Sequence, residues 1–164
     1  MKLSIIIPIY NVEPYLESCL LSVLNQNAID DTEIILINDC GTDNSMMIAE
    51  KYVKEYSPTH NITIINHTHN QGLSAARNTG VKNAKGDYVF FLDSDDELPQ
   101  NTISSFKHYL NNFGEVDFFV GNYIVDGPFK GTILKNTKNN STKVFAREEV
   151  SDFIIENTFL IEYF

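Results

Sequence analysis

Three carboxylates stand within four residues at Asp93-Ser94-Asp95-Asp96, directly after an apolar run. Such charges repel one another, and a hard divalent cation with oxygen ligands relieves the repulsion. The cluster therefore predicts Mg²⁺ or Mn²⁺, whereas no Cys/His spacing supports a soft metal. The alternative is that Asp95, Asp96 and Glu97 begin a helix, whose positive N-terminal dipole favours acidic side chains.

Two further acidic residues and one basic residue suit a nucleotide ligand. Glu13 and Asp39 end the loops after the first two apolar runs, so either can accept hydrogen bonds from a base or a ribose. Helix capping or solvent exposure is the alternative for each. Arg77 can reach a diphosphate or pair with a carboxylate of the acidic cluster, and a surface position is equally compatible. Three histidines are scattered over predicted loops, which disfavours a metal role: His60, His67 and His69.

Short apolar runs alternate with amphipathic segments along most of the chain. The runs read as strands buried on both faces of a parallel sheet: residues 3–7, 33–38, 62–66 and 87–92. The segments between them carry apolar residues at helical spacing: residues 14–26, about 45–56, 73–84 and about 101–111. This alternation predicts an α/β fold with right-handed crossovers and a mostly parallel, twisted sheet covered by helices on both faces.

Parallel sheets of this kind bind ligands beyond the carboxyl ends of their strands, where the strand order reverses. With an assumed order of 3-2-1-4, that point lies beside the loops at residues 9–13 and 93–96. The acidic cluster then lies where the fold binds a ligand. Further along the chain we expect a strand over 116–125, a long loop or loose hairpin over 126–142 and a last helix over 147–158.

The composition argues against several partners and locations. The 164 residues include 22 acidic and 12 basic side chains, for a formal charge of −10, so repulsion disfavours nucleic acids and anionic membrane surfaces. Cys19 and Cys40 do not make a disulfide framework, which favours a reducing, cytoplasmic setting. The apolar run after Met1-Lys2 is too short for a signal peptide, and no stretch reaches the roughly 18 apolar residues of a membrane span.

The first turn between a strand and a helix, residues 8–14, lacks the glycine-rich phosphate cradle of NAD(P)-binding proteins. Hydride transfer therefore loses its main support. A phosphorylated ligand can still bind an acidic site if a metal ion bridges carboxylate and phosphate. The hypothesis from the residues is an acidic pocket that a divalent cation makes suitable for phosphate.

Four blocks of residues stand in a fixed order over roughly residues 3–98. They are 4–11 with 15–20, Ser22 and Gln26; 33–35 with 38–45; 70–80; and 84–88 with 91–96. Each block alone is weak evidence, but together the four resemble the start of the family two glycosyltransferases of the GT-A fold. The resemblance implies a nucleotide-sugar donor, most often a UDP-sugar, together with Mn²⁺ or Mg²⁺.

The resemblance also implies roles for residues at the nucleotide. Pro8, Tyr10 and Glu13 match positions that line the uridine pocket, and Asp39 matches the acidic residue that binds the base. Asn38 departs from the commoner Asp, which weakens one expected nucleotide contact.

The metal-binding pair follows from the same resemblance. Asp93 and Asp95 match the D-x-D motif, in which the first carboxylate commonly meets the ribose and the second holds the metal ion on the diphosphate. Cys40 departs from the commoner Gly, and this change does not touch the pair.

The implied reaction is inverting transfer of the sugar to a hydroxyl of a carbohydrate or a lipid-linked glycan, while a general base takes the proton. We find no matching acidic motif, so we expect the base beyond Phe164 and a truncated chain with little transfer activity of its own. Residues 1–125 are then the donor-binding core, and 126–164 an incomplete acceptor-side region. By analogy, the parent protein acts in polysaccharide biosynthesis and associates peripherally with a membrane.

Two other functions stay open. The first is a non-catalytic nucleotide-binding or scaffolding module of the same shape. The second is another metal-dependent phosphoryl or nucleotidyl enzyme on a related fold. Nucleotidyltransferases usually carry a glycine-rich basic loop after the first strand, which is lacking, and haloacid-type phosphatases place their aspartate pair after the first strand rather than the fourth.

Overall fold

The computed structural model describes residues 2–113, 123–125 and 132–134. The chain divides into two compact units, Met1–Glu115 and Val116–Phe164, each described here by itself. The boundary expected at residue 125, between a donor-binding core and an acceptor-side region, stays a prediction.

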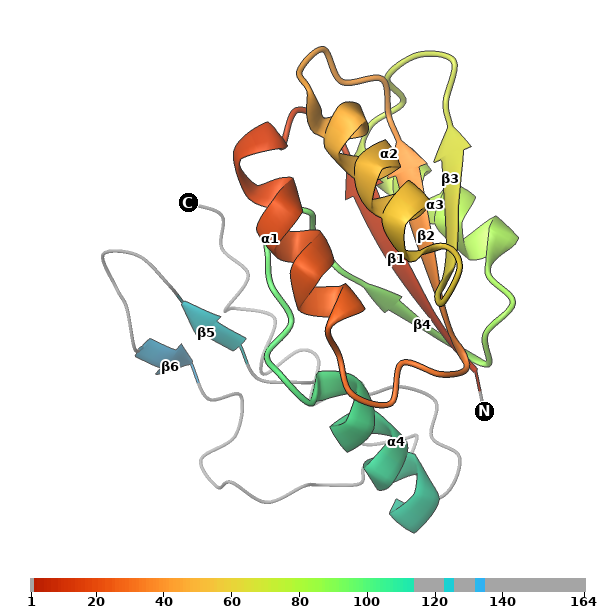
Figure 1. Ribbon diagram of the computed structural model, residues 1–164, viewed down its shortest axis with the longest axis vertical. Helices are drawn as coiled ribbons and strands as arrows, with labels where there is room; N and C mark the ends of the chain where they lie inside the picture. Colours follow the sequence, from red (N-terminus) through yellow and green to blue (C-terminus); the bar gives the residue numbers. More distant parts are fainter. Residues whose placement is uncertain (1, 114–122, 126–131, 135–164) are drawn as a thin grey trace, which may run out of the picture. The chain divides into compact units, whose positions relative to one another are not determined.

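The first unit is built on a four-stranded parallel sheet (Figure 1). Its strands lie in the order β3-β2-β1-β4, which agrees with the assumed order. Their bounds are β1 (Leu3–Ile9), β2 (Thr32–Asn38), β3 (Asn61–Asn66) and β4 (Tyr88–Phe91). Every residue of β1 is buried, because this strand is central in the sheet.

Helices cover both faces of the sheet, which confirms the predicted architecture (Figure 1). Helices α1 (Glu13–Leu24) and α2 (Ser45–Tyr56) pack on one face, and α3 (Leu73–Asn83) packs on the other. Successive β1 side chains alternate between these faces: Ile5 and Ile7 join the core beneath α1 and α2, whereas Ile6 contacts the cluster beneath α3. Helix α4 (Thr102–Phe113) ends the first unit's described part.

The second unit is described only at two short strands, β5 (Tyr123–Val125) and β6 (Thr132–Leu134). They pair in antiparallel fashion. Of the long loop or loose hairpin expected over 126–142, only residues 132–134 are described, and they form β6. The strand expected over 116–125 is described at its last three residues, and the helix expected over 147–158 lies outside the described residues.

Small residues let α3 approach the sheet closely. Ala76 is fully buried, and Gly80 lies directly over Ile6. A Cβ atom added at Gly80 would stand 2.3 Å from Cγ2 of Ile6. The close packing of α3 against the sheet therefore depends on the absence of a side chain at Gly80.

A hydrogen-bond network fixes the start of β4. The Ser4 hydroxyl donates to Oε1 of Glu33 at 2.6 Å and accepts from the Gly86 N–H at 2.8 Å. The Lys85 N–H donates to the same Glu33 oxygen at 2.5 Å. A Cβ atom at Gly86 would lie 2.6 Å from the Ser4 hydroxyl oxygen, so glycine is required there. The network therefore fixes where the chain enters β4.

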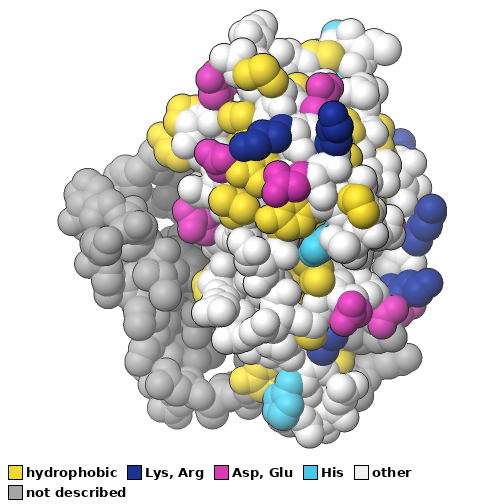
Figure 2. Space-filling model, viewed as in Figure 1, with side chains coloured by type: hydrophobic (Ala, Val, Ile, Leu, Met, Phe, Trp, Pro, Cys, Tyr) yellow, Lys and Arg dark blue, Asp and Glu magenta, His cyan; other side chains and the backbone are white. Residues whose placement is uncertain are grey.

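The surface over α1 and α2 carries acidic and basic side chains interspersed with one another, and Figure 2 shows this face. The face shown therefore does not present the one-signed basic patch that a nucleic acid would need. Among the helices of the described ranges, none combines the length and the apolar character needed to cross a bilayer.

Substituting Gly80→Ala should destabilise the protein by about 1–3 kcal/mol, because the added methyl group overlaps a buried side chain that cannot move away. An exposed helical Gly→Ala change stabilises instead, by about 0.5–1 kcal/mol. Urea denaturation measures the free energy of unfolding, with Val81→Ala as the control on the exposed face of α3. The double variant with Ile6→Ala should lose the penalty of the added methyl group. A Gly80→Ala variant as stable as the wild type would refute the close packing of α3.

Candidate functional site

The carboxyl ends of the four strands bring the predicted site residues to one edge of the sheet. Ile9 of β1 pairs with Asn38 of β2, which pairs with Asn66 of β3. The residues that follow these strands therefore stand side by side. The chain leaving β4 stays on the sheet through a hydrogen bond from the Leu92 N–H to the Ile6 carbonyl oxygen, 3.0 Å long, directly before the acidic cluster.

The loops after β1 and β2 are locked to each other. Asn11 adopts a left-handed conformation, and its side-chain oxygen accepts from the Thr42 N–H at 2.7 Å. The Val12 N–H donates to the Ser45 hydroxyl at 3.0 Å. A Cβ atom at Gly41 would lie 2.8 Å from the Asn11 nitrogen, which explains the glycine in this motif.

Glu13 completes this lock between the two loops. Its N–H donates to the Asp43 carboxylate at 2.9 Å, while its own carboxylate accepts from the N–H and the side-chain amide of Asn44 at 3.0 and 2.9 Å. Both carboxylate oxygens of Glu13 are therefore engaged with the protein, and its predicted contact with a nucleotide stays a prediction.

Two other residues predicted for the uridine pocket differ in accessibility. Pro8 is buried within β1, where it pairs with Ile37. Tyr10, just past the end of β1, is 47% exposed. Of the two, Tyr10 offers a ring surface to a ligand, and Pro8 shapes the backbone below it.

Asp39 is a buried carboxylate that accepts three hydrogen bonds. Oδ1 accepts from His67 Nδ1 at 2.7 Å and from the Gln71 N–H at 2.8 Å, and Oδ2 accepts from the Gly72 N–H at 2.9 Å. Burial by itself raises the pKa of Asp39, but hydrogen bonds from Gln71, His67 and Gly72 outweigh it and lower the pKa below 3.8. A carboxylate has roughly four acceptor positions, so one stays available for a further donor such as a base N–H.

Arg77 reaches the acidic cluster, as one of the predicted alternatives requires. Its Nη2 lies 2.5 Å from Oδ1 of Asp93, and both side chains are half-buried. The guanidinium also stands over the Phe91 ring, 5.8 Å from the centroid. The ion pair therefore joins α3 to the segment that follows β4.

The acidic cluster forms a turn rather than the start of a helix. The Asp96 N–H donates to the Asp93 carbonyl oxygen at 3.0 Å, and α4 begins only at Thr102. The alternative that Asp95, Asp96 and Glu97 open the next helix is therefore wrong. Burial, and then the negative charges of Asp95 and Asp93, raise the pKa of Asp96. The turn thus concentrates negative charge at the carboxyl edge of the sheet.

A buried thiol lies below this turn. Cys19 of α1 is fully buried, with Sγ 3.7 Å from the Asp93 carbonyl oxygen. Burial, together with the charges of Asp96 and Asp95, raises the pKa of Cys19 to about 12. The side chain is therefore a neutral thiol that packs under the turn and supplies no thiolate to a metal.

Two polar residues of α1 hold the segment that follows the turn. The Ser22 hydroxyl accepts from the Leu98 N–H at 2.9 Å. Gln26, which is buried, donates to the Pro99 carbonyl oxygen at 2.8 Å and accepts from the Ile103 N–H at 3.2 Å. Both residues belong to the motif that the sequence shares with the glycosyltransferases. These contacts explain why polar side chains are needed at the two positions: they bind the backbone that follows the turn.

The charges at the turn fit a cation shared with a ligand. Within the described ranges, no three His, Cys, Asp or Glu side chains are arranged to hold a metal ion by themselves. Mg²⁺ typically uses one or two carboxylates and takes its other ligands from phosphates and water. Asp95 is exposed, whereas Asp93 already pairs with Arg77. Asp95 is thus the carboxylate better placed to hold a metal ion.

His67 is a site residue that the sequence reasoning missed. Its ring is buried against Asp39 and lies 2.9 Å from the Thr79 hydroxyl through Nε2. One signal was available: His67 follows β3 by one residue, as Asp39 follows β2, and the two strands are neighbours. Residues at equivalent positions after paired parallel strands are expected to meet.

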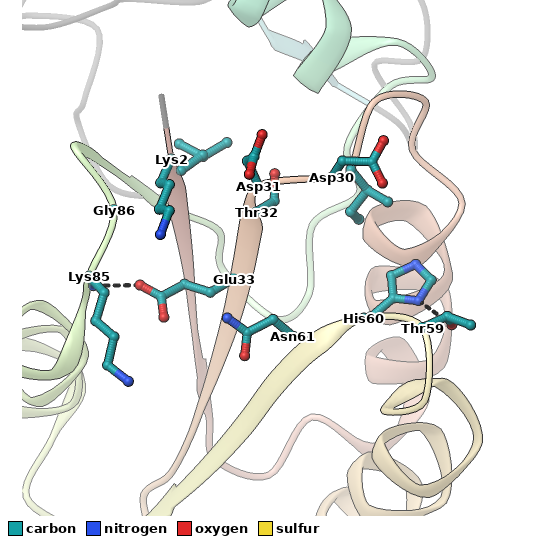
Figure 3. Close-up of a pocket in the computed structure, with 12 residues that line it drawn as sticks. Lys2, Asp30, Asp31, Thr32, Glu33, Thr59, His60, Asn61, Lys85 and Gly86 are labelled. Atoms are coloured by element: carbon teal, nitrogen blue, oxygen red, sulfur yellow. Dashed lines mark hydrogen bonds between the residues drawn. The ribbon is translucent and has the colours of Figure 1, made fainter.

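A cavity of about 380 Å³ lies at the opposite edge of the sheet, where the strands begin (Figure 3). Charged side chains of both signs line it, including Lys2, Asp31, Glu33 and Lys85. Figure 3 shows the hydrogen bond between the Glu33 carboxylate and the Lys85 backbone N–H, which helps to fix the start of β4. None of the predicted donor-site residues is among those that line this cavity, so it is separate from the carboxyl-edge site.

Comparison with known proteins decides the family. Residues 4–161 match the family described as Glycosyl transferase family 2. The chain belongs to this family. The resemblance that the motifs carry is therefore confirmed.

Two curated relatives illustrate the similarity. Glycosyltransferase GlyA of Streptococcus pneumoniae is 40% identical over 122 residues, which cover 74% of this chain and 17% of that protein. The poly(ribitol-phosphate) beta-glucosyltransferase of Bacillus spizizenii is 45% identical over 100 residues, covering 60% of this chain and 15% of that protein. The chain thus spans less than a fifth of the length of either relative.

Solved structures support the GT-A fold class. S. aureus TarS residues 1–349 in complex with UDP shares 32% identity at a TM-score of 0.62, over 68% of this chain and 32% of that one. The mannosyltransferase PcManGT from Pyrobaculum calidifontis, in complex with GDP-Man and Mn²⁺, has the same TM-score at 24% identity, over 66% and 32% of the two chains, and shows the fold alone.

Replacing Asp39 by Asn should destabilise the protein by about 1.5–3 kcal/mol at pH 7, because hydrogen bonds to a charged acceptor are lost. The wild-type pKa is lowered, so its contribution is complete above 3.8 and is lost as the pH falls through the lowered value. The difference in unfolding free energy between wild type and Asp39→Asn should therefore shrink below about pH 4.

Urea titrations from pH 7 to pH 3 measure this difference. Asp87→Asn is the matched control, because this exposed carboxylate accepts a hydrogen bond from the Lys2 N–H at 2.8 Å. Its effect should stay below about 1 kcal/mol at every pH. A gap for Asp39→Asn that does not change with pH would contradict the assigned role of the charge.

Proposed function

We propose that this chain supplies the donor-binding part of a glycosyltransferase that uses a nucleotide-diphosphate sugar. The observation that carries the proposal is the charge arrangement at the carboxyl edge of the sheet. The Arg77–Asp93 pair and the exposed Asp95 stand there together, and the buried Asp39 follows β2 at the same edge, on the other side of β1. Membership of glycosyl transferase family 2 supports the reaction class.

We take UDP as the nucleotide of the donor. TarS, at 32% identity, was solved with UDP and with UDP-GlcNAc. The exposed ring of Tyr10 and the remaining acceptor position of Asp39 suit a base that offers a stacking face and an N–H group. The sugar itself is left open by these contacts.

Asp95 would hold Mn²⁺ or Mg²⁺, which supplies charge stabilisation for the diphosphate. The acidic turn supports this assignment, since Asp93, Asp95 and Asp96 stand within four residues and a cation relieves their mutual repulsion. Arg77 holds Asp93 in place and keeps that carboxylate oriented toward the edge where a ribose would lie. Its guanidinium also brings positive charge close to the position of the diphosphate.

The chemistry is transfer with inversion. An acceptor hydroxyl oxygen forms the new bond to the anomeric carbon while the bond to the diphosphate breaks, and a carboxylate base takes the hydroxyl proton. We propose a carbohydrate or lipid-linked glycan as acceptor, in the assembly of a cell-surface polymer. The support is the relatives' names, which include a poly(ribitol-phosphate) beta-glucosyltransferase and a minor teichoic acid biosynthesis protein. No described carboxylate is assigned as the base.

Calorimetric titration with UDP tests the donor site. The wild type should bind UDP with Mn²⁺ present and lose most of the affinity in EDTA. Asp95→Asn should weaken binding by about 10–100-fold, as expected for the loss of a contact to a metal ion. GDP should bind more weakly than UDP.

The control is Asp87→Asn, an exposed carboxylate at the start of β4, which should bind UDP as the wild type does. Equal UDP affinity with and without the metal ion, or full affinity in Asp95→Asn, would contradict the proposed donor site. Tight binding of sugar phosphates without any for nucleotides would favour another metal-dependent enzyme class.

A further inference from the structure

We propose that His67 is a positioning residue of the donor site. It acts on helix α3 through its contacts with Thr79, which lies on α3, and with Asp39, which binds the start of α3. Helix α3 in turn positions Arg77 for its contact with Asp93. The inference rests on the proposed function, because it concerns the same carboxyl-edge site.

The ring of His67 is fixed at both nitrogens. Only 5% of its side chain is exposed, Nδ1 lies 2.7 Å from Asp39 Oδ1, and Nε2 lies 2.9 Å from the Thr79 hydroxyl. The ionised Asp39 can only accept, so Nδ1 must carry a hydrogen atom. The Thr79 hydroxyl both donates and accepts, so it satisfies Nε2 in either protonation state of the ring.

The backbone of His67 is held as firmly as its ring. Its N–H donates to the Asn38 carbonyl oxygen at 2.9 Å, which continues the pairing of β2 and β3 by one residue. Its carbonyl oxygen accepts from the Cys40 thiol at 3.0 Å. The imidazole is therefore a strut with one end anchored on the sheet and the other on α3.

Helix α3 is tied to the sheet edge at two points. Asp39 holds its start through the N–H groups of Gln71 and Gly72. His67 holds Thr79, about two turns further along. One attachment alone would let the helix pivot, whereas two set its direction and its rotation about its axis.

Arg77 lies on α3 between these attachments, and its contact with Asp93 depends on them. The Nη2–Oδ1 distance is 2.5 Å, so a helix movement of about 1 Å takes the pair beyond hydrogen-bond range. Ala76 and Gly80 face the sheet and set how closely α3 packs on it. The His67–Thr79 contact adds a polar attachment near Arg77 that this apolar packing does not supply.

Substitutions at Thr79 test the strut with little change of shape. Thr79→Val removes the hydroxyl and should weaken UDP binding in Mn²⁺ by about 10-fold, the lower range for a lost supporting contact. Thr79→Ser keeps the hydroxyl and should bind as the wild type does. Thr63→Val, on exposed β3, is the control for a lost threonine hydroxyl elsewhere. His67→Ala should match Thr79→Val or exceed it, and His67→Gln should recover part of the affinity by reaching Thr79.

The chemical shift of the Arg77 Nε–H in NMR spectra reports on the position of Arg77 and does not respond to a change in overall stability. It should shift in Thr79→Val and stay in place in Thr79→Ser and Thr63→Val, with or without nucleotide. An unchanged resonance and unchanged UDP affinity in folded Thr79→Val would overturn the inference while leaving the donor site intact. If the wild type binds no UDP, the proposed function fails, and the resonance alone then decides whether the strut positions Arg77. If His67→Ala does not fold, the Thr79 pair decides.

Discussion

The arrangement of the site depends on one interaction, the hydrogen bonding of the buried Asp39 carboxylate. An ionised carboxylate without partners costs several kcal/mol in a protein interior, so its donors must remain in place. Those donors come from His67 after β3 and from Gln71 and Gly72 at the start of α3. The charge thereby joins two strand ends to one helix. The same helix carries Arg77 to the acidic turn after β4.

The acidic turn concentrates negative charge and is held by hydrogen bonds on both sides. Ser22 and Gln26 of α1 hold the chain beyond the turn, and the Ser4–Glu33–Gly86 network holds the strand before it. Between these supports burial, and then the negative charges of Asp95 and Asp93, raise the pKa of Asp96. A protein of formal charge −10 can attract a diphosphate to such a place only when positive charge is present, from a metal ion and from Arg77.

Sequence reasoning recovered the four strands of the parallel sheet and helices α1 to α4, because apolar periodicity reports directly on burial. The strand order, which periodicity does not give, was assumed and agrees with the observed one. Sequence reasoning could not decide between a turn and a helix start at Asp95, since the contacts that hold the chain beyond the turn join residues more than 70 positions apart, as in Leu98 to Ser22. Pro99 was a local signal against a helix there, because the residue before a proline avoids helical geometry. Likewise, the roles of His67 and Glu13 depend on partners in other loops, which periodicity does not identify.

The central claim is that a metal ion and a nucleotide meet at the carboxyl edge of the sheet. Manganese is paramagnetic, so it broadens the NMR signals of nearby amides, and Mg²⁺ provides the diamagnetic reference. With UDP and Mn²⁺ bound, the account predicts selective broadening at Asp93–Glu97 and no effect at Lys2, Asn61 and Lys85, which line the cavity at the other edge. Broadening centred on that cavity, with sharp signals at Asp95, would contradict it.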